Sequence, residues 1–312
     1  MKRLTIFLAA FLFILTISQA QKEKGENSGK KASIHIETND GNDFVGKIIS
    51  EDSKTIKVST DKLGEITINK SDIKKREDLS QDQIIGNEFW FANANSTRYL
   101  FAPNAYALKK GEGYYQNTWV FMNQVSYGFT DKFTVGLGTV PLFLFGNSIA
   151  RATPFWITPK YTFGNQQANK NAAAGVFYFF FPFAGADEGP VSAGIVYGTG
   201  TIGNRNSNLS FGLGYGFGRS RLGGATTTAF AKYPTLNLSG MYRFSKSSYF
   251  VSENWLVTTG DFSAGLLSAA YRYCGKSFSI DIGLVGLASE DYTGVAAPWL
   301  GVLIPFSRAK SK

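Results

Sequence analysis

The stretch that decides the fold is Asn208–Gly218, NLSFGLGYGFG, in which glycine occupies every second position from 212 to 218. A dinucleotide-binding loop starting at Gly212 would need glycine at position 217, where the chain has phenylalanine, and no helical pattern follows. Alternate residues of an extended chain point to opposite faces. One face then carries Leu209, Phe211, Leu213, Tyr215 and Phe217, and the other carries Ser210 and the glycines. The stretch predicts a strand with one aromatic face and one nearly bare face.

The same alternation recurs from Thr97 to Phe306, in segments of roughly the length that a membrane-crossing strand needs. We count twelve segments: Thr97–Leu108, Tyr114–Phe129, Phe133–Phe145, Ala152–Phe163, Ala172–Phe183, Pro190–Thr201, Asn208–Gly218, Thr226–Phe244, Ser248–Thr258, Phe262–Tyr273, Phe278–Leu287 and Val295–Phe306. Twelve strands, give or take two, would place both ends of the region on one side, together with turns such as 130–132 and 245–247.

Two observations favour a membrane barrel over a soluble, secreted β-sandwich. Aromatic residues recur at segment ends, for example Tyr161/Phe163 and Tyr271/Tyr273, as in the aromatic girdles of barrels at the membrane surfaces. The other face is rich in glycine, serine and threonine, and the chain has only 18% charged residues, where about a quarter is usual for soluble proteins. The sequence predicts an all-β protein with a transmembrane antiparallel up-and-down β-barrel of about 12 strands.

The N-terminal part divides into three pieces. Residues 1–20 read as a signal peptide, with Lys2 and Arg3 before an apolar stretch and Ser18-Gln19-Ala20 as the cleavage site. A polar linker, 21–31, precedes a small β domain, 32–76. A second linker, 77–96, leads to the barrel, 97–306, and residues 307–312 form a tail.

The small domain reads as a β-meander of four short strands punctuated by Asp, Asn and Gly. They begin with SIHIET at Ser33, and the run ends in KSDIKK, which we expect to form a helical turn capped by Ser71. The pattern resembles the SH3-like or Sm-like barrels appended to bacterial envelope proteins. The acidic stretch Asn39–Asp43 lacks the twelfth-position glutamate of an EF-hand and reads as a turn.

The final segment, APWLGVLIPF, alternates into Phe306 and resembles the C-terminal assembly signal of bacterial outer-membrane barrels, except that six residues follow it. The whole region 97–306 resembles the uncharacterised β-barrels of Gram-negative outer membranes. The resemblance implies an outer-membrane location with the small domain in the periplasm, and outer-membrane lipid and the barrel assembly machinery as partners. It implies little about activity.

Charged residues within the predicted strands are the candidate functional residues, because a lipid-facing Arg or Lys near the midplane costs about 2–4 kcal/mol. Five of them fall on the less apolar face: Arg98, Lys160, Arg243, Arg272 and Asp281. We expect these five to point into the lumen, where Gly212, Gly214 and Gly216 leave room. They either pair with one another or with the small N-terminal domain to plug the lumen, or they line a narrow pore that favours anions. Glu253 cannot be assigned a face.

The sequence gives little support for catalysis, for metal or cofactor binding, or for nucleic-acid binding. The only histidine, His35, alternates with Ile34 and Ile36 and is expected to face solvent; barrel hydrolases, which this region would have to resemble, use a histidine base. The one cysteine, Cys274, excludes an intramolecular disulfide. The net charge of +9 is scattered rather than clustered, which argues against nucleic acid as a partner. We predict no catalytic residue, no cofactor and no metal.

The function that the sequence favours is a passive, porin-like channel or binding site for small, anionic solutes. The alternative is a structural or interaction protein whose barrel, with a filled lumen, anchors the small domain. A barrel enzyme and a soluble β-sandwich are less favoured.

Overall fold

A computed structural model describes residues 33–79, 84–85, 88–146, 152–182, 189–222, 225–258, 263–275, 277–289 and 293–307. The chain forms two compact units, Met1–Trp90 and Phe91–Lys312. The predicted signal peptide, the linker 21–31 and all of the predicted tail except Ser307 lie outside the described residues. No helix in the described ranges is long and apolar enough to span a membrane.

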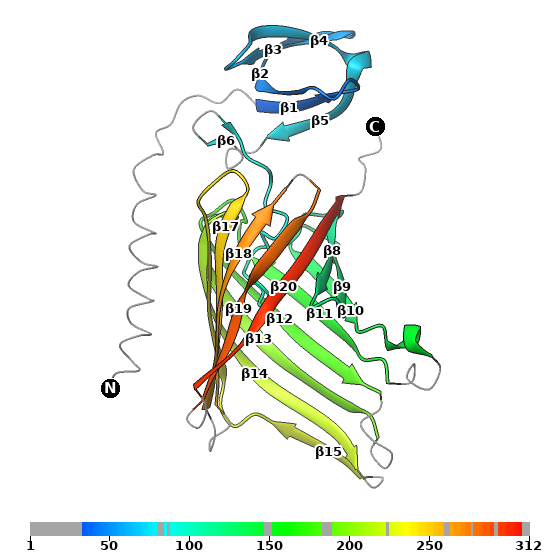
Figure 1. Cartoon of the computed structure of the whole chain (residues 1–312), viewed down its shortest axis with the longest axis vertical. Coiled ribbons are helices and arrows are strands. Elements are labelled where there is room, and N and C mark those ends of the chain that lie inside the picture. Colours follow the sequence, from blue (N-terminus) through cyan, green and yellow to red (C-terminus); the bar gives the residue numbers. More distant parts are fainter. Residues whose placement is uncertain are drawn as a thin grey trace, which may run out of the picture. The chain divides into compact units, whose positions relative to one another are not determined.

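The first unit contains one five-stranded antiparallel sheet with the order β4-β3-β2-β1-β5. Its strands are β1 (Ser33–Thr38), β2 (Asp43–Glu51), β3 (Thr55–Thr60), β4 (Gly64–Asn69) and β5 (Ile73–Leu79). The ribbon curls on itself (Figure 1), and Ile34, Ile36, Ile56, Val58 and Ile68 form its core. Two further short strands, β6 (Ile84–Ile85) and β7 (Glu88–Phe89), pair with each other.

The four predicted strands of this unit are present, but the sequence pattern missed β5. KSDIKK makes only the 3-10 turn η1 (Lys70–Asp72), and Ser71 lies inside this turn rather than capping it. The chain then continues as β5, which pairs with β1 at an edge of the sheet. β5 has the sequence IKKREDL, whose charges hide the apolar alternation, and charged residues are common on edge strands.

His35 is buried, with 3% of its surface exposed, so the prediction that it faces solvent was wrong. β1 is an interior strand between β2 and β5, and the burial on its two faces does not follow the alternation of SIHIET. The imidazole Nε2 lies 2.8 Å from Asp43 Oδ1. The position of His35 is therefore that of a buried, hydrogen-bonded residue of the small sheet.

The acidic stretch Asn39–Asp43 is a turn, as predicted. Asp40 accepts hydrogen bonds from the Thr38 hydroxyl and from Asn42, and the bond from Thr38 is the main cause that holds the pKa of Asp40 below its usual value. Gly41 takes a φ of 87°, which glycine adopts without strain. No cluster of metal-ligating side chains occurs among the described residues.

The second unit is a closed antiparallel barrel of twelve strands (Figure 1). Its elements are β8 (Glu112–Thr118), β9 (Met122–Gly128), β10 (Phe133–Thr139), the 3-10 turn η3 (Leu142–Phe145), β11 (Phe155–Phe163), β12 (Lys170–Phe181), β13 (Val191–Gly203), β14 (Asn208–Leu222), β15 (Ala225–Phe230), β16 (Thr235–Arg243), β17 (Ser248–Thr258), β18 (Ser263–Cys274), β19 (Ser279–Ser289) and β20 (Thr293–Ser307). Neighbouring strands pair in sequence order, and β20 pairs with β8 to close the ring. β15 and β16 both pair with β14, along different parts of its length, so the thirteen strands fill twelve positions in the ring.

The predicted number of strands is confirmed, although two of the twelve segments were wrong. One of them is not a strand and another is two strands, so the total is unchanged. Thr97–Leu108 forms no strand, and Tyr114–Phe129 is not one strand but the hairpin β8–β9. The hairpin escaped notice because its tip, Trp119–Phe121, contains none of the residues that usually mark a turn.

The barrel has two distinguishable ends. We call the end with the connections after β9, β11, β13, β16 and β18 the turn end; β8 starts there and β20 finishes there, as the strand count predicted. The opposite end, with the connections after β8, β10, β12, β14, β17 and β19, we call the loop end.

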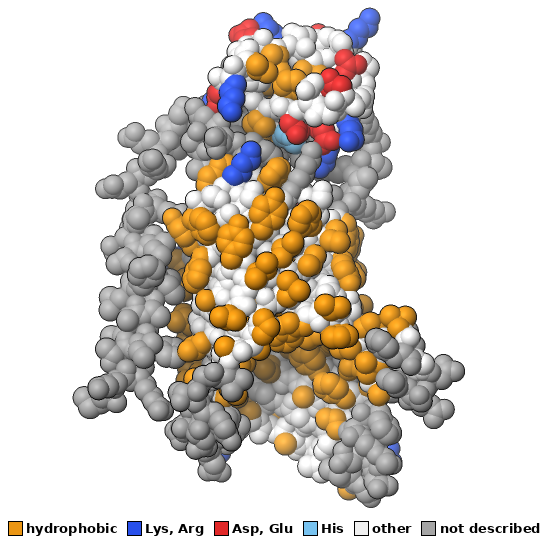
Figure 2. All heavy atoms as spheres, viewed as in Figure 1, with side chains coloured by type: hydrophobic (Ala, Val, Ile, Leu, Met, Phe, Trp, Pro, Cys, Tyr) orange, Lys and Arg blue, Asp and Glu red, His pale blue; other side chains and the backbone are white. Residues whose placement is uncertain are grey.

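The outer face of the barrel is apolar. On β14 the alternation is as the sequence predicted: Phe211, Leu213 and Tyr215 are 58%, 48% and 48% exposed, whereas Gly212 and Gly214 are buried. Figure 2 shows hydrophobic side chains over the barrel wall, with few charged ones. Large apolar side chains exposed over a continuous surface need an apolar environment, which for a closed barrel is lipid.

Candidate functional site

The inside of the barrel is occupied by the chain that precedes β8, residues 91–111, which we call the plug. Its central residues are among the most buried of the protein: Tyr99, Leu100, Ala102, Ala105, Tyr106 and Ala107 are each at most 1% exposed. Tyr99, Leu100 and Ala102 belong to a core cluster with residues of β16, β17, β18 and β20. The segment predicted as the first strand is thus the centre of the plug.

Lys160 on β11 holds the plug through its backbone. The side chain is 5% exposed. Its ammonium group donates to the carbonyl oxygens of Thr97 (2.9 Å), Asn104 (3.0 Å) and Tyr106 (2.6 Å). An ammonium has three donors and no acceptor, so all three are used by the plug.

Glu253 on β17, which the sequence left unassigned, holds the plug with the opposite charge. Its Oε2 accepts hydrogen bonds from three consecutive backbone amides, those of Leu100 (2.9 Å), Phe101 (2.7 Å) and Ala102 (2.8 Å). Its Oε1 accepts one from the Trp255 indole (2.8 Å). Glu253 is 7% exposed, and a carboxylate in so dry a place needs these charge-assisted bonds.

The strand that carries Glu253 departs from regular pairing at this point. β17 and β18 pair on both sides of Ser252–Asn254 but not across it. Side chains replace the missing backbone bonds: Ser268 Oγ accepts from Glu253 N (2.8 Å), and Asn254 Oδ1 accepts from Ser268 N (3.2 Å). This irregularity explains the poor alternation of the SEN stretch, and a carboxylate inside it was the only signal in the sequence.

Arg272 and Asp281 form a third attachment. They are directly opposite on β18 and β19, with Arg272 Nε and Nη2 2.6 and 2.9 Å from the two carboxylate oxygens. The same Nη2 donates to the carbonyl oxygen of Tyr99 (2.6 Å). Arg98 lies in the plug and not on a strand; its Nη2 is 3.9 Å from Asp281 and donates to Asn95 (2.7 Å).

Two arginines act at the turn end. Arg243 donates to Asn206 Oδ1 (3.0 Å) and to the carbonyl oxygen of Lys246 (2.5 Å), and its guanidinium lies over the Tyr249 ring. Arg205, which the sequence analysis missed because it falls in a turn, donates to the plug carbonyl of Ala107 (3.0 Å) and lies over the Tyr106 ring.

Small polar side chains of the wall complete the contacts with the plug. Tyr99 OH lies 2.6 Å from both Asn208 Oδ1 and Ser210 Oγ at the start of β14. Thr201 Oγ1 accepts from Ala105 N (2.8 Å) and Thr134 Oγ1 from Leu108 N (3.1 Å). Because the plug is not a strand, its backbone groups have no ladder and take their partners from these hydroxyls.

The three candidate glycines of β14 lie on the same face as Ser210. Gly212 and Gly214 line, together with Pro103 of the plug, a cavity of about 10 Å³, barely enough for one water. A larger cavity of about 40 Å³ lies between Arg98, Phe101 and Lys160 and has room for roughly three waters. The bare glycine face thus lies beside the plug.

Gly214→Ala is expected to destabilise the barrel by about 1–3 kcal/mol. The added Cβ would lie 2.6 Å from Ile195 Cγ2, which can move away only by a χ1 rotation that β-branched residues disfavour or by a backbone shift. Gly216→Ala is the matched control, because its Cβ would meet Ala231 Cβ at 3.4 Å and Gly194 O at 3.9 Å, which are ordinary contact distances. Urea unfolding in detergent, followed by the heat-dependent gel shift, measures both. Equal midpoints for the two variants would show that the close approach at Gly214 has no consequence.

The comparisons with known proteins add two structures of limited similarity. No family model matches the sequence, and no curated protein matches it. The structure described as "KdgM porin in complex with disordered oligogalacturonate" is 13% identical, with a TM-score of 0.40, over 62% of this chain and 98% of that one. "Salmonella typhi OmpF complex with Daunomycin" is 9% identical, with a TM-score of 0.28, over 88% of this chain and 95% of that one.

Proposed function

We propose that this chain is an integral outer-membrane β-barrel that binds a small molecule and is closed to free diffusion by its own plug. The observation that carries the proposal is the grip on the plug backbone by charged groups from three strands, Lys160, Glu253 and Arg272. Contacts of this number and burial hold one defined conformation of the plug. In this state the barrel works as a binding protein and not as an open pore.

The preference for anionic solutes belongs to a state in which the plug has moved. In the present arrangement Arg98, Lys160 and Arg272 are occupied by backbone carbonyls or by Asp281. With the plug displaced, the wall cations Lys160, Arg243 and Arg272 would outnumber the acids Glu253 and Asp281, and anions would be favoured.

The second candidate is a membrane anchor for the small β domain, with a permanently filled lumen. The burial of the plug supports it. The two candidates differ in whether the plug can be displaced without unfolding the barrel. The predicted signal peptide supports export in both cases, and the periplasmic location of the small domain is part of both proposals.

The full chain, reconstituted in planar bilayers, is expected to show no steady conductance, because the plug closes the turn end. Brief openings under voltage or mild urea should favour chloride over potassium. The same sample should migrate differently on a gel before and after boiling, which establishes that a folded barrel was tested. A large, permanently open conductance from folded protein would contradict the closed state.

A further inference from the structure

We propose that the inner face of the barrel beyond the plug takes up the hydrocarbon chain of a membrane amphiphile, which enters sideways from the bilayer over the low wall formed by β8, β9 and β10. This inference rests on the proposed membrane location. It concerns the part of the lumen that adjoins the plug on the side of the loop end, where Trp255 is bonded to Glu253.

The barrel wall is short, measured along its strands, at three adjacent strands; we call this part the low wall. β8, β9 and β10 have seven residues each, whereas β13 has 13 and β14 and β20 have 15. A strand needs about 9–11 residues to cross a membrane. All three strands have one terminus at the turn end, as their neighbours do, so their other termini stop within the hydrocarbon layer.

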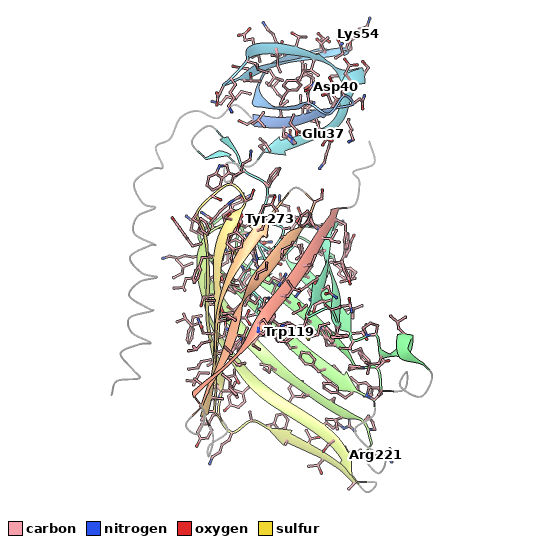
Figure 3. All side chains as sticks on the ribbon, in the orientation of Figure 1. Glu37, Asp40, Lys54, Trp119, Arg221 and Tyr273 are labelled. Atoms are coloured by element: carbon pink, nitrogen blue, oxygen red, sulfur yellow. The ribbon has the colours of Figure 1, made fainter. Side chains whose placement is uncertain are left out.

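The register of β20 shows where the wall stops. β20 pairs with β8 only over Gly301–Ser307, and Trp119 N at the tip of the β8–β9 hairpin donates to Leu300 O (3.0 Å). Within the described part of the chain, Thr293–Trp299 have no strand partner on this side. Figure 3 shows Trp119 between Tyr273 at the turn end and Arg221 at the loop end.

The hairpin tip is built for an apolar environment. Trp119, Val120 and Phe121 are 41%, 66% and 57% exposed. Trp119 and Val120 have φ values of 51° and 68°, a region that is strained for a β-branched residue. Asparagine and glycine would suit this turn better, so the apolar side chains are retained against the local backbone preference.

Several polar groups of the tip are hydrogen-bonded within the protein, which lowers the cost of placing them in hydrocarbon. Asn117 Nδ2 donates to the carbonyl oxygen of Val120 (2.8 Å), and Asn123 Nδ2 to that of Phe121 (2.8 Å). On the open edge of β20, Trp119 Nε1 donates to Pro298 O (2.7 Å). Pro298 itself has no N–H to leave unpaired.

Beyond the plug, the inner face of the wall carries a group of apolar side chains next to polar ones such as Asn237, the cross-strand partner of Trp255. Trp255 shares the face of Glu253, to which it is bonded. Its cross-strand partner is Leu266, whose partner is Leu287. Both leucines are 38% exposed although they point inward. On the other side of the lumen, the Phe179 ring lies between two other rings. Its centroid is 5.9 Å from that of Trp156 and 6.4 Å from that of Phe101 in the plug.

These features point to one class of occupant. A lumen that passes hydrated ions or sugars is lined with polar groups, whereas this inner face offers aromatic rings and leucines. The short strands β8, β9 and β10 are all that separates it, on that side, from the lipid-facing surface. An acyl chain is therefore the ligand whose chemistry matches, with its head group left toward the loop end.

Tryptophan quenching by bromine-labelled chains tests the proposal. A variant that keeps only Trp255 (Trp90, Trp119, Trp156 and Trp299 changed to Phe) is reconstituted in phosphatidylcholine vesicles. Brominated stearic acid is expected to quench Trp255 saturably, with reversal by unlabelled stearic acid. Quenching by brominated phosphatidylcholine instead would also support the proposal and would identify a bilayer lipid as the occupant. No quenching of Trp255 by either probe would overturn it.

Two controls separate the proposal from its premise. A variant that keeps only Trp119 should be quenched by brominated phosphatidylcholine; if it is not, the barrel does not lie in the bilayer as proposed, and the proposed function fails with it. Leu266→Asn, added to the Trp255-only variant, should weaken stearic acid binding by about tenfold. Leu267→Asn is the matched control, because Leu267 is equally exposed at 38% but belongs to the outer face. Equal loss in both variants would contradict binding on the inner face.

Discussion

Changing Glu253 to alanine should open the closed barrel. The substitution leaves the amides of Leu100, Phe101 and Ala102 buried without their acceptor, and removing one partner of a buried charged network costs about 3–5 kcal/mol. Much of this loss should fall on the plug, because the strands keep their own ladders. In planar bilayers we expect frequent openings that favour anions, whereas the wild-type protein is expected to show no steady conductance.

The protein contains its own reporter for this experiment. Cys274, the only cysteine, is 1% exposed, and the plug residues Asn93 and Asn95 contact its sulfur at 3.8 and 3.9 Å. A charged thiol reagent should modify Cys274 about 100-fold faster in Glu253→Ala if some 3 kcal/mol is lost from holding the plug.

The matched control for Glu253→Ala is Glu112→Ala. Glu112 also accepts a backbone amide, that of Lys109 (3.0 Å), but at the exposed end of the plug. It should leave both conductance and labelling unchanged. If Glu253→Ala folds and yet neither conducts nor reacts faster at Cys274, the plug is a permanent filling and the anchor function is the better account.

The wall of the barrel was predictable from the sequence, but its contents were not. A two-residue period reports which side of a strand is apolar, so the faces of Asn208–Gly218 could be predicted directly. The plug carries the same alternation in Thr97–Leu108 without being a strand. Period alone cannot distinguish a segment that is bonded in a ladder from one that is bonded by side chains of the wall.

For the charged residues too, the sequence pattern predicts the face of the strand but not the bonding partner. Pattern placed Lys160, Arg272 and Asp281 on the less apolar face, where they are now seen to be buried, but it gave no partner for any of them. Glu253 could not be placed at all, because β17 is irregular at that residue. The short hairpin β8–β9 was missed because its tip breaks the usual preference for turn residues. In each case a contact distant in sequence overrides the local signal.

The pair Arg272–Asp281 offers the second large effect. Arg272→Met is expected to lower the free energy of unfolding by about 3–5 kcal/mol. The loss arises because Asp281, 2% exposed, keeps Arg98 at 3.9 Å as its one remaining cationic partner among the described residues. The measurement is urea unfolding in detergent, followed by the heat-dependent gel shift.

A second substitution distinguishes the cost of an unpaired charge from the loss of a contact. Arg272→Met combined with Asp281→Asn removes the isolated carboxylate and should recover at least half of the lost stability. Arg272→Lys should rank between the wild type and Arg272→Met, because it keeps the charge but cannot bond both carboxylate oxygens and the Tyr99 carbonyl in the same planar arrangement. If the double variant is as unstable as Arg272→Met, the pair matters through its hold on Tyr99. The attachment to the plug would then be a larger part of the barrel's stability than the ion pair in its wall.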